Sequence, residues 1–95
     1  MTSKQRAYLR GLANTMEPIV HVGKEGVSEN MVRQLSEALE ARELVKGTVL
    51  QNSPVTAREA IAELCEGTGA EPVQCIGNRF VVYRAREKEP KIILP

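Results

Sequence analysis

The sequence predicts an α/β fold: one domain with the element order α-β-α-β-α-β-β, in which a mixed four-stranded sheet packs with helices. Three observations predict it. A chain of 95 residues is too short to divide its apolar residues between two independent cores. Segments with a helical apolar stripe alternate with short β-branched runs. Hydrophobic residues make up 42% and charged residues 26% of the chain, the balance of a folded domain.

The first element is expected to be a helix over residues 2–16. Thr2 and Gln5 have the spacing of a capping box. An apolar stripe follows at helical spacing, formed by Tyr8, Leu9, Leu12, Ala13 and Met16. Pro18 then ends this segment, and residues 19–22 predict a short strand that leads into a loop with two glycines, residues 23–26.

The middle of the chain predicts a helix that begins at the cap Ser28 and runs toward Leu44. A strand is expected over residues 44–50, where Gly47 either weakens the strand or marks a close backbone approach. Thr56 and Glu59 form a second capping box for a third helix, which ends at residues 67–69.

The last elements are a predicted hairpin of two strands, residues 73–76 and 80–84, joined at Gly77 and Asn78. Two right-handed crossovers are expected to make the first three strands neighbours, with the hairpin adding an antiparallel fourth. Residues 86–95 form a charged and then apolar tail, whose residues 92–94 are expected to dock on an edge.

Charge is distributed unevenly although the net charge is only +1. Residues 1–10 and 79–91 each carry +3, whereas residues 29–43 carry −2 and residues 56–71 carry −3. The sequence therefore predicts an acidic side and a basic side, and the basic side suits a phosphate backbone. The chain holds no Trp and few aromatic residues, so base stacking on aromatic rings is not expected to be a main binding mode.

Several classes of site are disfavoured. No apolar run approaches the length of a membrane span, and the amino terminus does not resemble a signal peptide. Cys65 and Cys75 lack metal-ligand spacing and are expected to be reduced and buried. His21 has no catalytic partners and is expected to be a buried or hydrogen-bonded strand residue. Glu37, Glu40 and Glu43 are expected on a solvated helix face.

One loop and a set of basic residues remain as candidates. The loop Gly23-Lys24-Glu25-Gly26 lies between a strand and a helix start, where free N–H groups favour an anion. A tight turn with no ligand explains the same four residues equally well, and the P-loop pattern is absent. Basic residues of the first helix and of the strand after the hairpin, together with Lys24 and Lys46, could contact phosphates; ordinary solvated charge is the alternative.

The whole chain resembles the YhbY-like family, whose domain is called the CRM domain, for chloroplast RNA splicing and ribosome maturation. The resemblance rests on motifs in order along the sequence: Leu9-Arg10-Gly11-Leu12-Ala13, Pro18-Ile19-Val20, Val22-Gly23-Lys24-Glu25-Gly26-Val27, Glu43-Leu44-Val45-Lys46, Val73-Gln74-Cys75-Ile76-Gly77, Val82-Tyr83-Arg84 and Lys91-Ile92-Ile93-Leu94-Pro95. It implies a fold like the carboxy-terminal domain of translation initiation factor 3. It also implies RNA binding through a G-x-x-G loop like that of KH domains, and binding of large-subunit ribosomal precursors.

Carried over to this chain, the resemblance implies an RNA contact surface formed by Gly23, Lys24, Glu25, Gly26, Lys4, Arg10, Lys46, Arg79 and Arg84. We therefore expect a cytoplasmic, monomeric RNA-binding assembly factor that engages ribosomal RNA, with no catalytic residues, metal or cofactor. Two alternatives stay open: an adaptor that binds a ribosomal or translation protein, and, less favoured, a small hydrolase or nucleotide-dependent enzyme.

Overall fold

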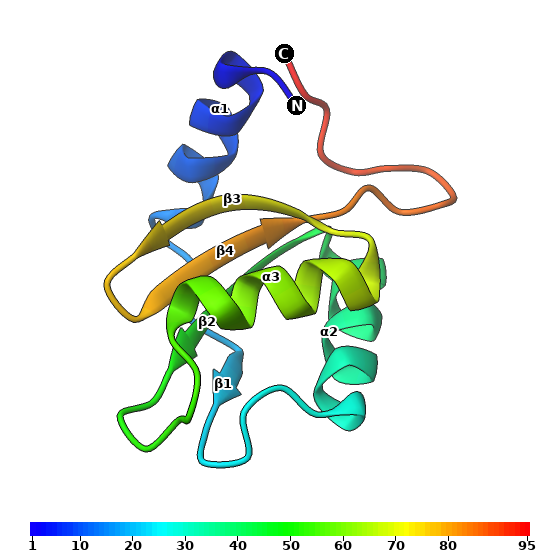
Figure 1. Cartoon of the computed structure of the whole chain (residues 1–95). Coiled ribbons are helices and arrows are strands. Elements are labelled where there is room, and N and C mark those ends of the chain that lie inside the picture. The colour runs from blue at the N-terminus through cyan, green and yellow to red at the C-terminus, as the bar shows by residue number, and fades with distance from the viewer.

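The computed structural model describes residues 1–95, and its seven elements follow in the expected order (Figure 1). They are α1 (Ser3–Ala13), β1 (Val20–Val22), α2 (Glu29–Arg42), β2 (Leu44–Val49), α3 (Ala57–Thr68), β3 (Glu71–Ile76) and β4 (Arg79–Tyr83). The fold class is confirmed: three helices pack with a mixed four-stranded sheet in one domain.

All three predicted helix starts are confirmed by their capping contacts. Thr2 and Thr56 each form a complete capping box with the side chain three residues later, and the Ser28 hydroxyl accepts the N–H of Met31. These caps satisfy amide groups that have no partner within their own helix. The ends differ slightly: α1 ends at Ala13, and α3 continues to Thr68 before Gly69 stops it with a φ of 76°.

The strand order is β1-β2-β4-β3, so the expectation that the first three strands are neighbours is wrong. β1 and β2 pair in parallel, and β4 lies between β2 and β3, antiparallel to both. The central position of β4 follows from its composition, since residues 80–83 are all buried and the strand needs apolar cover on both faces. β3 takes the edge, where Pro72 costs no sheet hydrogen bond on the open side.

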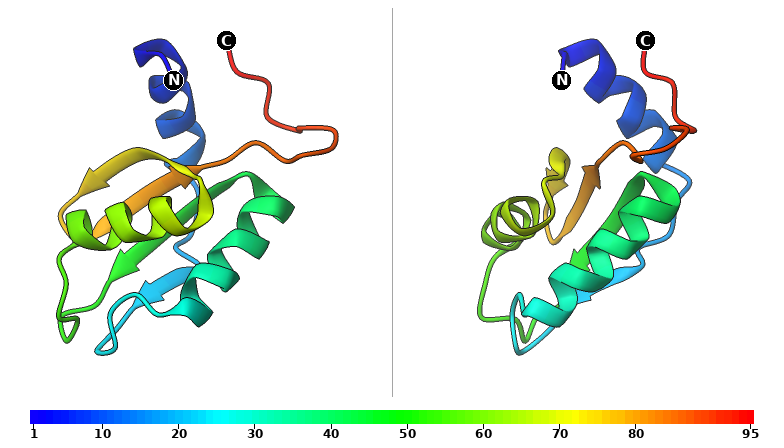
Figure 2. Two further views of the ribbon diagram at one scale, coloured as in Figure 1. Left: turned by 45° about the vertical axis from the view of Figure 1, so that its right-hand side comes forward. Right: turned by 90° about the vertical axis from the view of Figure 1, so that its right-hand side faces the viewer.

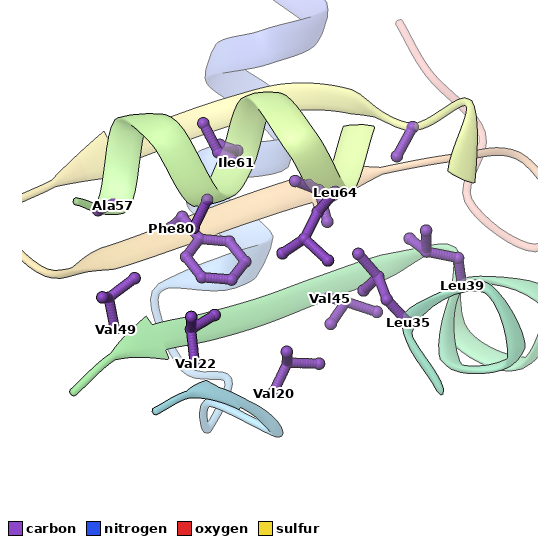
Figure 3. Close-up of a cluster of buried hydrophobic side chains, with 13 residues drawn as sticks. Val20, Val22, Leu35, Leu39, Val45, Val49, Ala57, Ile61, Leu64 and Phe80 are labelled. Carbon is purple, nitrogen blue, oxygen red and sulfur yellow. The ribbon is translucent and has the colours of Figure 1, made fainter. Parts of the chain in front are cut away.

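Helices cover the two faces of the sheet unequally (Figure 2). α2 and α3 pack on one face and share with it the larger apolar core, 13 buried residues that include Leu35, Leu64 and Phe80 (Figure 3). α1 packs on the other face over a smaller cluster of six residues that includes Leu9 and Val81. Because α1 is the only helix on that face, part of the sheet there is left uncovered.

Gly47 marks a close approach, the second of its two expected roles. A Cβ atom on Gly47 would overlap the ring of Phe80. Figure 3 shows that ring lying between β2 and α3. A side chain at residue 47 would therefore displace Phe80, the largest fully buried side chain.

The tail docks, but on the α1 side of the sheet and not on a strand edge. Ile92 and Leu94 pack against the smaller cluster, whereas Ile93 is 82% exposed. The tail also passes close to α1, where Gln5 donates a hydrogen bond to the carbonyl of Pro95.

A buried carboxylate, Glu43, holds the tail in place. Its Oε1 accepts the N–H groups of Lys91 and Ile92 at 2.7 and 2.9 Å, and its Oε2 accepts that of Arg86 at 3.1 Å. The expectation that Glu43 lies on a solvated face is wrong, because this residue is 0% exposed. It follows Leu35 and Leu39 at intervals of four residues, so it continues the inward stripe of α2 just as the chain turns with a φ of 67°.

Candidate nucleic-acid interface

The predicted loop forms an exposed turn between β1 and α2. The N–H of Gly26 donates to the carbonyl of Gly23 at 3.0 Å, which leaves Lys24 and Glu25 at the exposed tip. Only Gly26 needs glycine for its conformation, with a φ of 67°; it is buried against Pro54. The backbone N–H groups of Lys24 and Glu25 have no acceptor within the chain, so they are free to donate to a ligand.

The turn lies at one end of the sheet, at the bottom of Figure 1. β1, β2 and β3 run in the same direction, so the loops after them emerge at the same end. α2 and α3 begin there, which aims the positive ends of two helix dipoles at that end. Glu29 and Glu59 lie in the first turns of these helices and offset part of this positive potential.

Arg79 is brought to the same end as the loop. It begins β4 directly after the turn at Gly77 and Asn78, and its pairing partners are Thr48 and Ile76. Arg79 is exposed and has no carboxylate partner within the chain. It is therefore available to a phosphate, as is Lys24.

The other nominated cations lie farther from the loop. Lys46 lies on the α1 side of β2, half-buried, and its Nζ donates to the carbonyl of Ala13 at 3.3 Å, at the carboxyl end of α1. Lys4 and Arg10 are exposed on α1, which stands at the opposite end of the molecule from the loop in Figure 1. The predicted residues thus do not form one patch: Lys24 lies at the loop, Lys46 and Arg79 lie together on the α1 side of the sheet, and Lys4 and Arg10 lie on α1.

Arg84 is used inside the fold. One guanidinium nitrogen donates to the Ser36 hydroxyl and to the carbonyl of Thr68 at 3.1 and 2.7 Å. The other donates to the carbonyl of Ser36 at 2.9 Å and lies 3.5 Å from Glu40. With a side chain 24% exposed, Arg84 joins α2 to the end of α3, and these contacts occupy the groups that a phosphate would need.

The sheet separates an acidic side of the molecule from a basic side, as the sequence predicts. The two acidic segments form α2 and α3 on one face of the sheet, whereas the basic α1 and the tail lie on the other. The uncovered sheet surface beside α1 contributes Lys46 and Arg79 to this basic side.

The side chain of His21 is exposed and makes no hydrogen bond within the chain, contrary to expectation. In the three-residue β1 the flanking valines point into the core, so His21 points to the uncovered face. The two cysteines are free and half-buried, which is less buried than expected. Burial, together with the negative charge of Glu71, raises the pKa of the Cys65 thiol to about 11.

Sequence reasoning missed a hollow of about 210 Å³ at the carboxyl end of α1. Its lining includes the polar residues Asn14, Gln74, Lys46 and Arg79, and Ile76 adds an apolar side. Of these residues, only Lys46 and Arg79 were singled out by the sequence analysis. The register of β3 shifts between Pro72 and Gln74, and no motif announces that bulge.

Two further features limit the possible sites. No group of three or more His, Cys, Asp or Glu side chains is placed to hold a metal ion. None of the three helices is long and apolar enough to cross a membrane.

Comparisons with known proteins agree with one another. The profile of the CRS1 / YhbY (CRM) domain matches residues 1–84. The chain is 43% identical over 95 residues to the Bacillus subtilis protein named "Probable RNA-binding protein YqeI", covering 100% of this chain and 99% of that one. It is 36% identical over 95 residues to a Haemophilus influenzae protein named "RNA-binding protein", with 100% and 95% covered.

A solved structure shows the same fold. The solution structure of a hypothetical protein from Staphylococcus aureus, described as a proposed RNA-binding protein, superposes with a TM-score of 0.82 at 44% identity. The match covers 100% of this chain and 99% of that one.

Proposed function

Because the chain belongs to the CRS1 / YhbY (CRM) domain family, we propose that it binds RNA through the Gly23–Gly26 loop and the cations near it. Relatives of nearly equal length are named as RNA-binding proteins, which supports this proposal. The observation that carries it is the exposed turn with the unpaired N–H groups of Lys24 and Glu25.

The turn suits the sugar-phosphate backbone. Two adjacent N–H groups donate to phosphate oxygens, and the Lys24 ammonium adds a charge beside them. Arg79 at the same end holds a neighbouring phosphate. Such contacts read the shape and course of the backbone and fix the register of the RNA without reading its bases.

The RNA is proposed to be ribosomal RNA in precursors of the large subunit, and the protein to be a non-catalytic, cytoplasmic, monomeric assembly factor. The separation of charge by the sheet supports a surface that meets RNA on one side. The shallow, exposed turn supports a binding role without catalysis, because a reaction centre needs groups converging on a cleft.

The loop is tested by a double variant, Lys24→Asp with Glu25→Asp, measured for binding to a fragment of large-subunit ribosomal RNA by fluorescence anisotropy. Lys88→Asp, in the exposed tail segment, makes the same change in charge away from the loop. We expect the loop variant to lose at least tenfold in affinity and to show a shallower salt dependence. Equal binding by the loop variant and the Lys88 control would refute the proposed contact.

The ribosomal target is tested by sedimentation of cell lysates at low and moderate salt. The proposal expects co-migration with large-subunit precursors, weakened by salt and lost in the loop variant. Co-migration that survives nuclease treatment and does not depend on Lys24 would instead support a protein-binding adaptor. Free migration of both forms would contradict the ribosomal assignment.

A further inference from the structure

We propose that the hollow at the carboxyl end of α1 receives one unpaired nucleobase of the bound RNA, and that Asn14 and Gln74 read its edge. This inference rests on the proposed RNA-binding function and adds base recognition to a loop that reads only the backbone. It concerns a different surface from the loop, the uncovered part of the sheet beside α1.

Two side-chain amides of the hollow have no partner within the chain. The side-chain amides of Asn14 and Gln74 make no hydrogen bond within the chain, although Gln74 is half-buried. Each amide offers both a donor and an acceptor, the combination that pairs with base edges. Arg79 also lacks an internal partner, and Lys46 has only the carbonyl of Ala13.

Charge and size both fit one base. No carboxylate lines the hollow, so Lys46 and Arg79 favour the phosphates on either side of an inserted nucleotide. Its volume of about 210 Å³ is below the range of roughly 300–1,000 Å³ typical of drug-sized ligands and leaves room for a single planar ring system. Ile76, which is 65% exposed, offers an apolar surface for the ring face.

The other two hollows of the molecule are poorer candidates for a base. The hollow around Arg84 has three glutamates in its lining, and its arginine is committed to Ser36 and Thr68. The hollow at the free edge of β3 lies between Arg6 and Arg58, but Pro72 and the adjacent bulge interrupt that edge. Prolines and bulges at a sheet edge prevent pairing with another strand. They explain the hollow at the β3 edge without any ligand.

The position of the hollow connects it with the loop. Arg79, on its rim, lies in a row of paired residues that crosses the sheet through Thr48 to His21. β1, which carries His21, continues directly into the Gly23–Gly26 turn. A strand of RNA held at the turn can therefore follow this uncovered face toward the hollow, on the side that the sheet separates from the acidic helices.

The test uses labelled hairpin RNAs with one common stem and loops made only of A, of C, of G or of U, together with a fully paired duplex. Affinities are measured for the unmodified protein, for Asn14→Ala with Gln74→Ala, and for Lys24→Ala. Gln34→Ala, an exposed glutamine on α2 on the other face of the sheet, is the matched control. Thermal unfolding of each variant confirms that it is folded.

We expect the unmodified protein to prefer one loop base by about tenfold or more, the effect typical of a well-placed contact to a base edge. The Asn14 and Gln74 variant loses this preference and binds the duplex as before, while Lys24→Ala weakens binding to every RNA. If the variant keeps the preference, or if the unmodified protein shows none, the base site is refuted and the loop proposal stands. If Lys24→Ala binds every RNA normally, the loop proposal fails instead.

Discussion

Replacing Glu43 with Gln tests whether this buried carboxylate holds the tail. The substitution keeps the size of the side chain and removes its charge. One oxygen remains to accept the N–H groups of Lys91 and Ile92, but the NH2 group that replaces the other oxygen faces the N–H of Arg86, so two donors oppose each other.

The magnitude follows from these three bonds. A hydrogen bond to a charged group contributes about 1.5–3 kcal/mol and a neutral one about 0.5–1.5 kcal/mol. Weakening two bonds by about 1–1.5 kcal/mol each and losing a third therefore costs about 3.5–6 kcal/mol if the tail stays in place. Detachment of the tail lets its amides bind water and limits the loss, so we expect Glu43→Gln to lower the free energy of unfolding by about 2–4 kcal/mol.

The assay is urea denaturation followed by circular dichroism, on the full chain and on a chain shortened to end at Ala85. Because the shortened chain lacks all three donors, Glu43→Gln should cost it little. A cost below about 0.5 kcal/mol in the full chain, or an equal cost in both chains, would refute the tail-holding role.

The same contacts predict a pH dependence. Burial raises the pKa of Glu43, but the N–H groups of Ile92, Arg86 and Lys91, with the positive charge of Arg86, lower it by more. A lowered pKa means that the unfolded chain binds this proton more readily, so the stabilisation is present above the ordinary value of 4.5 and is lost as the pH falls through the folded value. The stability of Glu43→Gln should change less over that range.

Three further outcomes are expected. Gly47→Ala should lower the free energy of unfolding by about 1–3 kcal/mol, because its methyl group overlaps the Phe80 ring; a neutral effect in denaturant titrations would show that the ring has room to move. Arg84→Ala should cost about 2–4 kcal/mol, because the Thr68 carbonyl at the end of α3 loses its donor and the Ser36 carbonyl and hydroxyl lose a charged one; Arg84→Lys should recover only part of this, and full recovery would show that charge alone matters. Cys65 in a Cys75→Ala chain should react slowly with iodoacetamide at pH 8 and faster up to about pH 11; a rate already maximal at pH 8 would contradict its raised pKa.

The sequence predicted local structure well because its signals are local. Capping boxes, the Gly77-Asn78 turn and the apolar stripe of α3 act within a few residues and are present in the structure, whereas in the stripe predicted for the first helix only Leu9 and Ala13 are buried and Tyr8 and Leu12 are exposed. Connection rules alone misplace β4, because they take no account of how much of each strand must be buried. The unbroken apolar run of β4 indicates a strand covered on both faces, and it explains why β4 lies at the centre.

The candidate site was harder to predict, because the sequence does not show whether a charged side chain is free or bonded to another part of the fold. Lys24 and Arg84 look equivalent as basic residues of a motif, yet Lys24 is exposed and Arg84 bonds to the backbone of two helices. The charge of Glu43 predicts a solvated position, whereas its spacing from Leu39 points it inward, and spacing prevails in the structure. These distinctions depend on contacts between residues about 16 to 49 positions apart, which no local pattern encodes.

The docking of the tail beside α1 brings the two ends of the chain to the same side of the molecule. Figure 1 shows both termini at the top, with the Gly23–Gly26 turn at the bottom. A fluorophore, an affinity tag or a surface tether attached at either end therefore points away from the turn. Neighbouring ends also suit insertion of this domain into an exposed loop of a host protein, where it could serve as a module that presents the turn outward.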